Sequence, residues 1–136
     1  MPKIKIEGNH ELSGTITVGG AKNSVVALIP AAILCDETVT ISNVPNITDV
    51  DDLEKILLHL NAKIERSPGT VVINSSDIIN KEITQELSKK LRASYYFMGA
   101  LLGKFNRVDM YFPGGCAIGA RPINLHLKGF ESLGAT

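Results

Sequence analysis

The spacing of hydrophobic and polar positions changes repeatedly over residues 15–74, and each change predicts an element. A β-branched run at 15–18 ends at two glycines, which predicts a strand and a turn. Residues 21–34 are rich in alanine and leucine at helical spacing and predict a helix. The further expected elements are a strand at 38–41, a helix at about 49–60 capped by Thr48, and strands at 63–66 and 70–74 around a Ser-Pro-Gly turn. The order β-α-β-α-β-β indicates an α/β fold.

The second half of the chain repeats this order at an offset of 70 residues, from Lys22 to Arg92. The helix at 21–34 then falls on an apolar helix at about 91–104, and the strand at 38–41 falls on residues 108–111. We expect two packed copies of one β-α-β-α-β-β unit. The second copy lacks its closing hairpin, so we also expect the chain to be a piece of a longer polypeptide.

Composition narrows the class of protein. The 136 residues are 44% hydrophobic, enough to fill the core of one globular unit. Fourteen Lys and Arg balance fourteen Asp and Glu, which argues against binding to nucleic acid or to an anionic membrane. No run approaches the roughly 20 apolar residues of a membrane span. Because the two cysteines fit neither a disulfide framework nor a CxxC pair, we expect a soluble protein in the reducing cytoplasm.

The most informative stretch is residues 113–122, with the sequence Pro-Gly-Gly-Cys-Ala-Ile-Gly-Ala-Arg-Pro. Three glycines between a predicted strand and a predicted helix allow a ligand to approach the backbone closely and leave Cys116 accessible. Arg121 could favour the thiolate, and Pro122 suits the first turn of the next helix. The alternative is that Cys116 is an ordinary small residue in a glycine-rich turn. Loops of this kind usually serve a site, which favours a functional role.

Two cations are the other candidate site residues. Residues 19–24 (Gly-Gly-Ala-Lys-Asn-Ser) are typical of an anion-binding helix start, although Ala21 excludes a P-loop. Lys22 could equally be a solvated surface lysine and Asn23 a cap. Arg92 is the repeat partner of Lys22, so we expect both to face one crevice. A surface salt bridge is the alternative for Arg92.

Other reactive residue types are expected to be structural. Cys35 ends an apolar run and is predicted to pack in the core. His59 and His126 lie on predicted helices without metal ligands at suitable spacing, so no metal site is expected. The aromatic residues at 95–97, followed by Met98, point around one helix. We therefore predict core packing there, with at least one side chain partly exposed.

Three motifs together resemble those of the UDP-N-acetylglucosamine enolpyruvyl transferases: residues 20–23 (Gly-Ala-Lys-Asn), 91–94 (Leu-Arg-Ala-Ser) and above all the cysteine loop at 113–122. The resemblance covers the whole chain. It implies the enolpyruvyl transferase (EPSP synthase-like) fold, in which repeated β-α-β-α-β-β units form two domains with the active site between them. Residues 21–136 would be a partial first domain, and residues 1–20 a strand segment that belongs to the second.

The resemblance also implies an activity without a metal or organic cofactor. Such enzymes transfer the enolpyruvyl group of phosphoenolpyruvate to the 3-hydroxyl of UDP-N-acetylglucosamine, the first committed step of peptidoglycan synthesis. By position, Cys116 would be the general acid and the residue presented to fosfomycin. Lys22 and Asn23 would contact phosphoenolpyruvate or the sugar. The nucleotide-sugar site would be lined by Arg92, Arg121, Pro122, Ile123, Asn124 and Leu125, with Arg121 also reaching the enolpyruvate phosphate.

Two departures from the family pattern qualify these expectations. Asn124 stands where many members have Asp, which would retune uridine recognition. The second domain is missing, so we expect no turnover by this chain alone and self-association through an exposed face, whereas the full enzyme would be a monomer. The alternatives are a non-catalytic nucleotide-sugar-binding or interaction module of the same fold, and a shikimate-type transferase. Cys116 argues against the latter because those enzymes lack the Gly-Gly-Cys loop.

Overall fold

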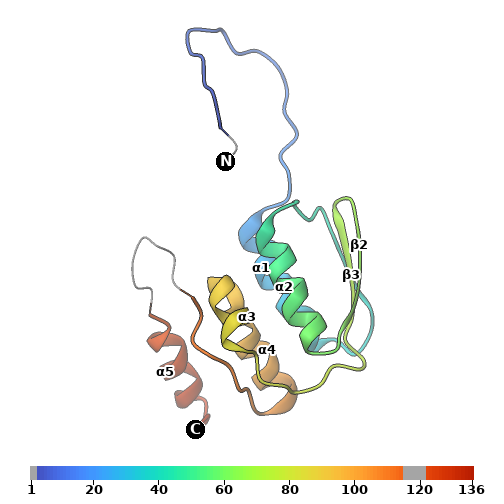
Figure 1. Cartoon of the computed structure of the whole chain (residues 1–136), viewed down its shortest axis with the longest axis vertical. Coiled ribbons are helices and arrows are strands. Elements are labelled where there is room, and N and C mark those ends of the chain that lie inside the picture. The colour runs from blue at the N-terminus through green and yellow to red at the C-terminus, as the bar shows by residue number, and fades with distance from the viewer. Residues whose placement is uncertain (1–2, 115–121) are drawn as a thin grey trace.

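The computed structural model describes residues 3–114 and 122–136, and its elements form successive layers (Figure 1). A small sheet lies on one side, α1 and α2 cover it, α3 and α4 follow, and α5 lies at the opposite edge. The elements are α1 (Lys22–Ala31), η1 (Ala32–Leu34), β1 (Val39–Ser42), α2 (Thr48–His59), β2 (Lys63–Ser67), β3 (Thr70–Asn74), α3 (Gln85–Lys90), η2 (Arg92–Tyr95), α4 (Tyr96–Phe105) and α5 (Asn124–Ser132).

The sheet is antiparallel with the strand order β1-β3-β2. In its register, Val39 pairs with Ile73 and Lys63 pairs with Asn74. The hairpin between β2 and β3 turns at Gly69, whose φ of +72° is a conformation that side chains other than glycine rarely adopt. The hairpin predicted around the Ser-Pro-Gly turn is therefore confirmed.

The core lies between the sheet and the helices. Alternate residues of β3 face inward, and α1 and α2 pack against each other over them, with α4 behind α1. Each large side chain that is fully buried contributes about 1.5–3 kcal/mol to folding. The largest are Phe97, Ile29, Ile33, Leu53, Ile56, Leu57, Leu60, Ile73, Ile83, Leu101, Val50 and Val71. Phe97 is buried while its neighbour Tyr96 is partly exposed, as predicted for the aromatic run.

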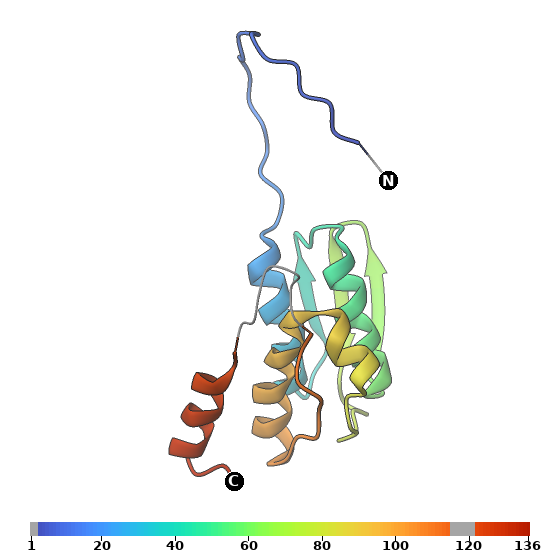
Figure 2. The same cartoon turned by 60° about the vertical axis from the view of Figure 1, so that its left-hand side comes forward.

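The predicted strand at 15–18 was wrong. Residues 3–19 run away from the folded part without regular structure (Figures 1 and 2). Ile16 and Val18 are 88% and 83% exposed. A β-branched run becomes a strand only when a neighbouring strand accepts its hydrogen bonds, and the described residues supply none.

The second half of the chain departs from the predicted repeat in three places. The strand expected at 108–111 is reduced to one parallel bridge between Ile83 and Met110. The helix expected at 91–104 is split into η2 and α4, and the helix α3 before it was not predicted. The repeated helices α1 and α4 nevertheless pack against each other, as expected of duplicated units.

Two single-residue predictions were also wrong. Thr48 is the first residue of α2 and not its cap; the cap position is Ile47, which makes no side-chain cap bond. Cys35 is exposed, because the backbone becomes extended after η1 and carries this residue off the apolar face. Within residues 3–114 and 122–136, no helix combines the length and hydrophobicity needed to cross a bilayer.

Candidate functional site

The predicted cations meet at a cavity of about 380 Å³ between the starts of α1, α2 and η2. It is lined by Lys22, Asn23, Val26, Asp49, Lys89, Lys90, Leu91, Arg92, Ala93, Tyr95, Tyr96 and Gly114. A larger cavity of about 590 Å³ lies between α4 and α5, but none of the predicted site residues that the structure describes lines it. The smaller cavity is therefore the candidate site.

Lys22 and Asn23 reach the cavity because Gly20 anchors the start of α1. A Cβ built on Gly20 would lie 1.6 Å from the carbonyl oxygen of Asn43, so only glycine permits this close approach. Asn43 directly follows β1 and leads toward α2. The contact brings the first turns of α1 and α2 together, and Lys22 Nζ lies 2.6 Å from Asp49 Oδ2.

Arg92 enters the same cavity at the start of η2. Its guanidinium carbon lies 5.9 Å from the centre of the Tyr95 ring, within the range of a cation–π contact. Arg92 Nε is buried and has no hydrogen-bond partner among the residues that the structure describes. Such an atom is costly unless something accepts its hydrogen bond. The sequence prediction that Lys22 and Arg92 face one crevice is confirmed.

Gly114, the last described residue before Cys116, also lines this cavity. Its backbone N–H donates to the Ser88 carbonyl over 3.0 Å at the end of α3. A Cβ on Gly114 would lie 1.9 Å from the Lys89 carbonyl oxygen, so this position also requires glycine. Cys116 and Arg121, the predicted residues of the loop itself, lie outside the described residues.

The remaining predicted residues begin α5 and do not line the cavity. Ile123 is 4% exposed and occupies the N-cap position, while Asn124 and Leu125 form the exposed first turn. Pro122 therefore precedes the cap, and its predicted place in the first turn was wrong. Tyr95 bridges the two regions, since its ring lies 5.0 Å from that of His126 on α5.

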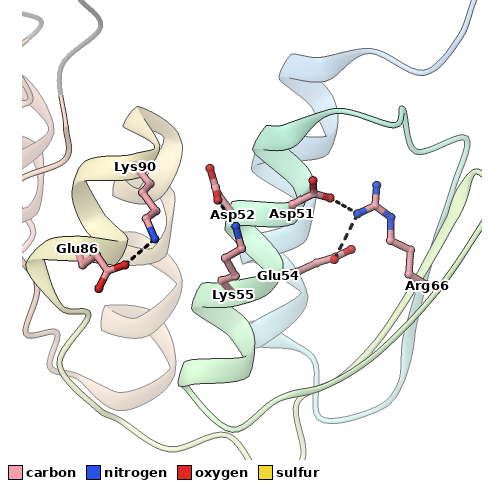
Figure 3. Close-up of polar contacts among 7 residues, drawn as sticks. All are labelled: Asp51, Asp52, Glu54, Lys55, Arg66, Glu86 and Lys90. Carbon is pink, nitrogen blue, oxygen red and sulfur yellow. Dashed lines mark hydrogen bonds and ion pairs between the residues drawn. The ribbon is translucent and has the colours of Figure 1, made fainter.

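The charge at the cavity favours an anion. Lys22, Lys89, Lys90 and Arg92 line it against one carboxylate, Asp49. Lys90 also bonds Glu86 over 2.7 Å (Figure 3), and this bond lowers the pKa of the Glu86 carboxyl. A hydrogen bond with Tyr96, together with burial, raises the pKa of Tyr95 and keeps that phenol neutral. The arrangement can hold a phosphate or carboxylate group.

Sequence reasoning missed several lining residues, among them Asp49, Lys89, Lys90 and Tyr95. Asp49 was expected only as a residue of the helix at about 49–60, and Tyr95 only to pack in the core. Neither has a sequence signal for the cavity, because each reaches it across a contact between separate elements. Among residues 3–114 and 122–136, no group of three His, Cys, Asp or Glu residues is placed to hold a metal ion.

Comparison with known proteins identifies the family. A family model described as EPSP synthase (3-phosphoshikimate 1-carboxyvinyltransferase) matches residues 6–136. Proteins named UDP-N-acetylglucosamine 1-carboxyvinyltransferase 2 are 50% identical over 135 residues in Oceanobacillus iheyensis and 52% identical over 135 residues in Lactiplantibacillus plantarum. Each match covers 99% of this chain and 32% of the relative. The chain thus spans about a third of the length of the curated relatives it matches.

A solved structure that resembles this chain points to the same family. The enolpyruvyl transferase NikO from Streptomyces tendae superposes with a TM-score of 0.63 and 26% sequence identity, over 72% of this chain and 23% of that chain. The predicted α/β enolpyruvyl transferase fold and the resemblance found in the motifs are therefore confirmed. The chain belongs to the EPSP synthase (3-phosphoshikimate 1-carboxyvinyltransferase) family of enolpyruvyl transferases.

Proposed function

We propose that the protein carrying this chain transfers the enolpyruvyl group of phosphoenolpyruvate to the 3-hydroxyl of UDP-N-acetylglucosamine. The observation that carries the proposal is the meeting of Lys22, Asn23, Arg92 and Gly114 at one cation-lined cavity. The names of the similar proteins, at 45–52% identity, support the nucleotide sugar as the acceptor. Because the chain spans about a third of those proteins, it would supply part of the active site.

The charges of the substrates fit the charges of the cavity. Phosphoenolpyruvate carries a phosphate and a carboxylate, and UDP-N-acetylglucosamine carries a diphosphate. Fixed cations at a site that excludes water stabilise such charge more strongly than water does. Lys22 and Asn23 would contact phosphoenolpyruvate or the sugar near the reacting atoms. Arg92, with its buried Nε, would face the nucleotide sugar.

Cys116 would be the general acid toward phosphoenolpyruvate in an addition and elimination that releases phosphate. It follows Gly114 by two residues, and two peptide units span at most about 7 Å. The nucleotide-sugar site would be completed by Arg121, which also reaches the enolpyruvate phosphate, and by Pro122, Ile123, Asn124 and Leu125. Asn124, neutral where many members carry Asp, would alter the contact with uridine.

The domain assignment follows from the same proposal. Residues 21–136 would be part of the first domain, and residues 1–20 would join the second. The protein would act in the cytoplasm, at the first committed step of peptidoglycan synthesis. Through that step it would take part in cell-wall biogenesis, cell shape, the cell cycle and cell division. Its partners would be the two small-molecule substrates, and the full enzyme would be a monomer.

Adduct formation with fosfomycin tests the cysteine assignment. Because Cys35 is exposed, the chain should first carry Cys35→Ser, so that any adduct reports on Cys116. We expect one adduct on Cys116 by mass spectrometry, formed faster when UDP-N-acetylglucosamine is present. A Cys116→Ala chain treated identically is the control. The absence of any adduct, or a rate indifferent to the nucleotide sugar, would contradict the assignment of Cys116 to a site that is already formed in this chain.

Turnover and binding separate the proposal from its alternatives. We expect the 136-residue chain, mixed with both substrates, to release phosphate no faster than its Cys116→Ala variant, and the full-length protein to release it readily. A full-length protein that binds the nucleotide sugar without turnover would be a binding module. Binding of shikimate 3-phosphate in preference to UDP-N-acetylglucosamine would identify a shikimate-type transferase.

A further inference from the structure

Asp49 is the one acidic residue among those that line the described part of the cavity. Its Oδ2 lies 2.6 Å from Lys22 Nζ. The Asp49 side chain is only 18% exposed, whereas that of Lys22 is 56% exposed. The carboxylate is thus the fixed member of the pair, and the lysine is the member that reaches into solvent.

The backbone holds this pair from both sides. Gly20 packs against the Asn43 carbonyl two residues before Lys22, and Asp49 lies in the first turn of α2. Val26, one helical turn after Lys22, and Val50, the residue after Asp49, are buried and tie α1 and α2 to the common core. In both views the two helices run side by side, with their N-terminal ends at the same end of the molecule (Figures 1 and 2).

A lysine needs such a partner more than an arginine does. Its ammonium is a point charge on a stem with four rotatable bonds, and ordering that stem costs conformational entropy. A carboxylate at hydrogen-bond distance restricts the ammonium to one region of the cavity before any ligand arrives. Preorganised charge of this kind stabilises a transition state without reorganisation at the moment of reaction.

We propose that Asp49 is a positioning residue that holds the Lys22 ammonium toward the phosphate or carboxylate group of phosphoenolpyruvate. The inference rests on the proposed function, because that function supplies the anion. Since the Lys22–Asp49 pair is neutral as a whole, the general attraction for anions comes from Arg92 and the neighbouring lysines. Lys22 then contributes a charge placed at one position in the cavity, and Asp49 fixes that position.

Positioning and simple electrostatics predict opposite effects of Asp49→Asn. If Asp49 only adds negative charge near an anion site, its removal strengthens anion binding and leaves or raises the rate. If it positions Lys22, the rate falls, because misplacing a catalytic group by about 1 Å can cost on the order of 100-fold. The sign of the change therefore separates the two accounts.

The test uses the full-length protein with Asp49→Asn, Asp49→Glu, Lys22→Met and the double variant Lys22→Met with Asp49→Asn. We expect Asp49→Asn to lower kcat about 10- to 100-fold with KM for UDP-N-acetylglucosamine nearly unchanged, and Asp49→Glu to recover most of the rate. In the Lys22→Met background, Asp49→Asn should have no further effect, because a residue that acts only through Lys22 has nothing left to position.

Asp52→Asn is the matched control. It removes a carboxylate from the same helix, where Asp52 pairs with Lys55 outside the cavity (Figure 3). This variant should keep the wild-type rate. Equal rate losses from Asp49→Asn in the wild-type and Lys22→Met backgrounds would overturn the inference and indicate a structural role. So would an unchanged or increased kcat in Asp49→Asn.

Failure of the proposed function would be recognised separately. If the wild-type protein does not turn over both substrates, or if Lys22→Met is fully active, the reaction or the role of Lys22 is wrong. Calorimetric titration with inorganic phosphate then tests Asp49 alone. Weaker binding by Asp49→Asn than by Asp52→Asn supports positioning, and equal or tighter binding overturns it.

Discussion

At the scale of single residues, two glycines decide where the site lies. The backbone of Gly20 lies close to the carbonyl oxygen of Asn43, and that of Gly114 lies close to the carbonyl oxygen of Lys89. Neither glycine is required because of a positive φ. Each is required because a Cβ would have no space at that position. The chain can therefore bring Lys22, Arg92 and the backbone of Gly114 to one cavity only because these two positions lack a Cβ.

Replacing Gly20 with alanine should destabilise the chain. The new Cβ would lie 1.6 Å from the Asn43 carbonyl oxygen, so the backbone of α1 or of the segment before α2 must shift. We expect the free energy of unfolding in urea to fall by about 1–3 kcal/mol, as for other overpacked sites. Gly19→Ala is the control, because nothing lies within 4 Å of a Cβ there. Equal stability of the two variants would contradict the close approach.

At the scale of elements, Arg66 joins the hairpin to α2. The guanidinium of Arg66, on β2, bonds Asp51 and lies 3.4 Å from Glu54 on the helix (Figure 3). It also donates to Asn46 over 3.2 Å. Burial raises the pKa of the Glu54 carboxyl above its ordinary value of 4.5, and Arg66 offsets part of that rise. The arginine thus favours the charged form of this carboxylate against the effect of burial.

Arg66→Gln should therefore destabilise the chain in a pH-dependent way. A raised pKa means that Glu54 contributes stability when protonated and loses that contribution as pH rises through its folded-state pKa. Without Arg66 the pKa of Glu54 rises further, so the loss of stability is largest near neutral pH, about 1 kcal/mol for a partly exposed network. Urea unfolding should show the difference from wild type shrinking from pH 7 to pH 4.

The control for this prediction is Lys55→Gln, which removes an exposed ion pair with Asp52 on the same helix. Glu54 is not a partner in that pair, so the stability change should stay nearly constant over the same pH range. A loss in Arg66→Gln that was constant, or that grew toward acid pH, would show that Glu54 is not the group responsible.

At the scale of the whole molecule, the N-terminal segment stands apart from the folded part (Figure 2). Its large apolar side chains are 83–94% exposed: Ile4, Ile6, Leu12, Ile16 and Val18. Exposed apolar side chains of this kind gain stability only by joining another surface, and in this chain they stay open to association.

Deleting residues 1–18 should leave the fold intact. Because residues 3–18 contribute nothing to the core, we expect the free energy of unfolding to change by less than about 0.5 kcal/mol. Light scattering after size-exclusion chromatography should show less self-association than in the whole chain. A clear loss of stability would mean that the segment packs on the core in solution. Unchanged self-association would mean that the chains associate through another surface.

Local sequence patterns predicted much of the fold and missed its long-range parts. The helices near residues 21–34 and 49–60 and the hairpin at Gly69 follow from periodicity and turn chemistry, which act within a few residues. Residues 15–18 and 108–111 had the composition of strands, but strands need partners that their own sequence does not contain. The prediction that Cys35 packs in the core was wrong for a similar reason, since its apolar neighbours do not reveal the direction in which the chain leaves η1.

The sequence by itself determined the family, the helical and hairpin elements of residues 21–74, and the two cations of the candidate site. These features depend on short motifs and on local backbone preferences. Only the tertiary structure decided which charged groups meet: Lys22 with Asp49 in the cavity, and Arg66 with the first turns of α2. Such contacts depend on distances between separate elements, and those distances are set by the packing of the shared core and by the close approach of Gly20 to Asn43.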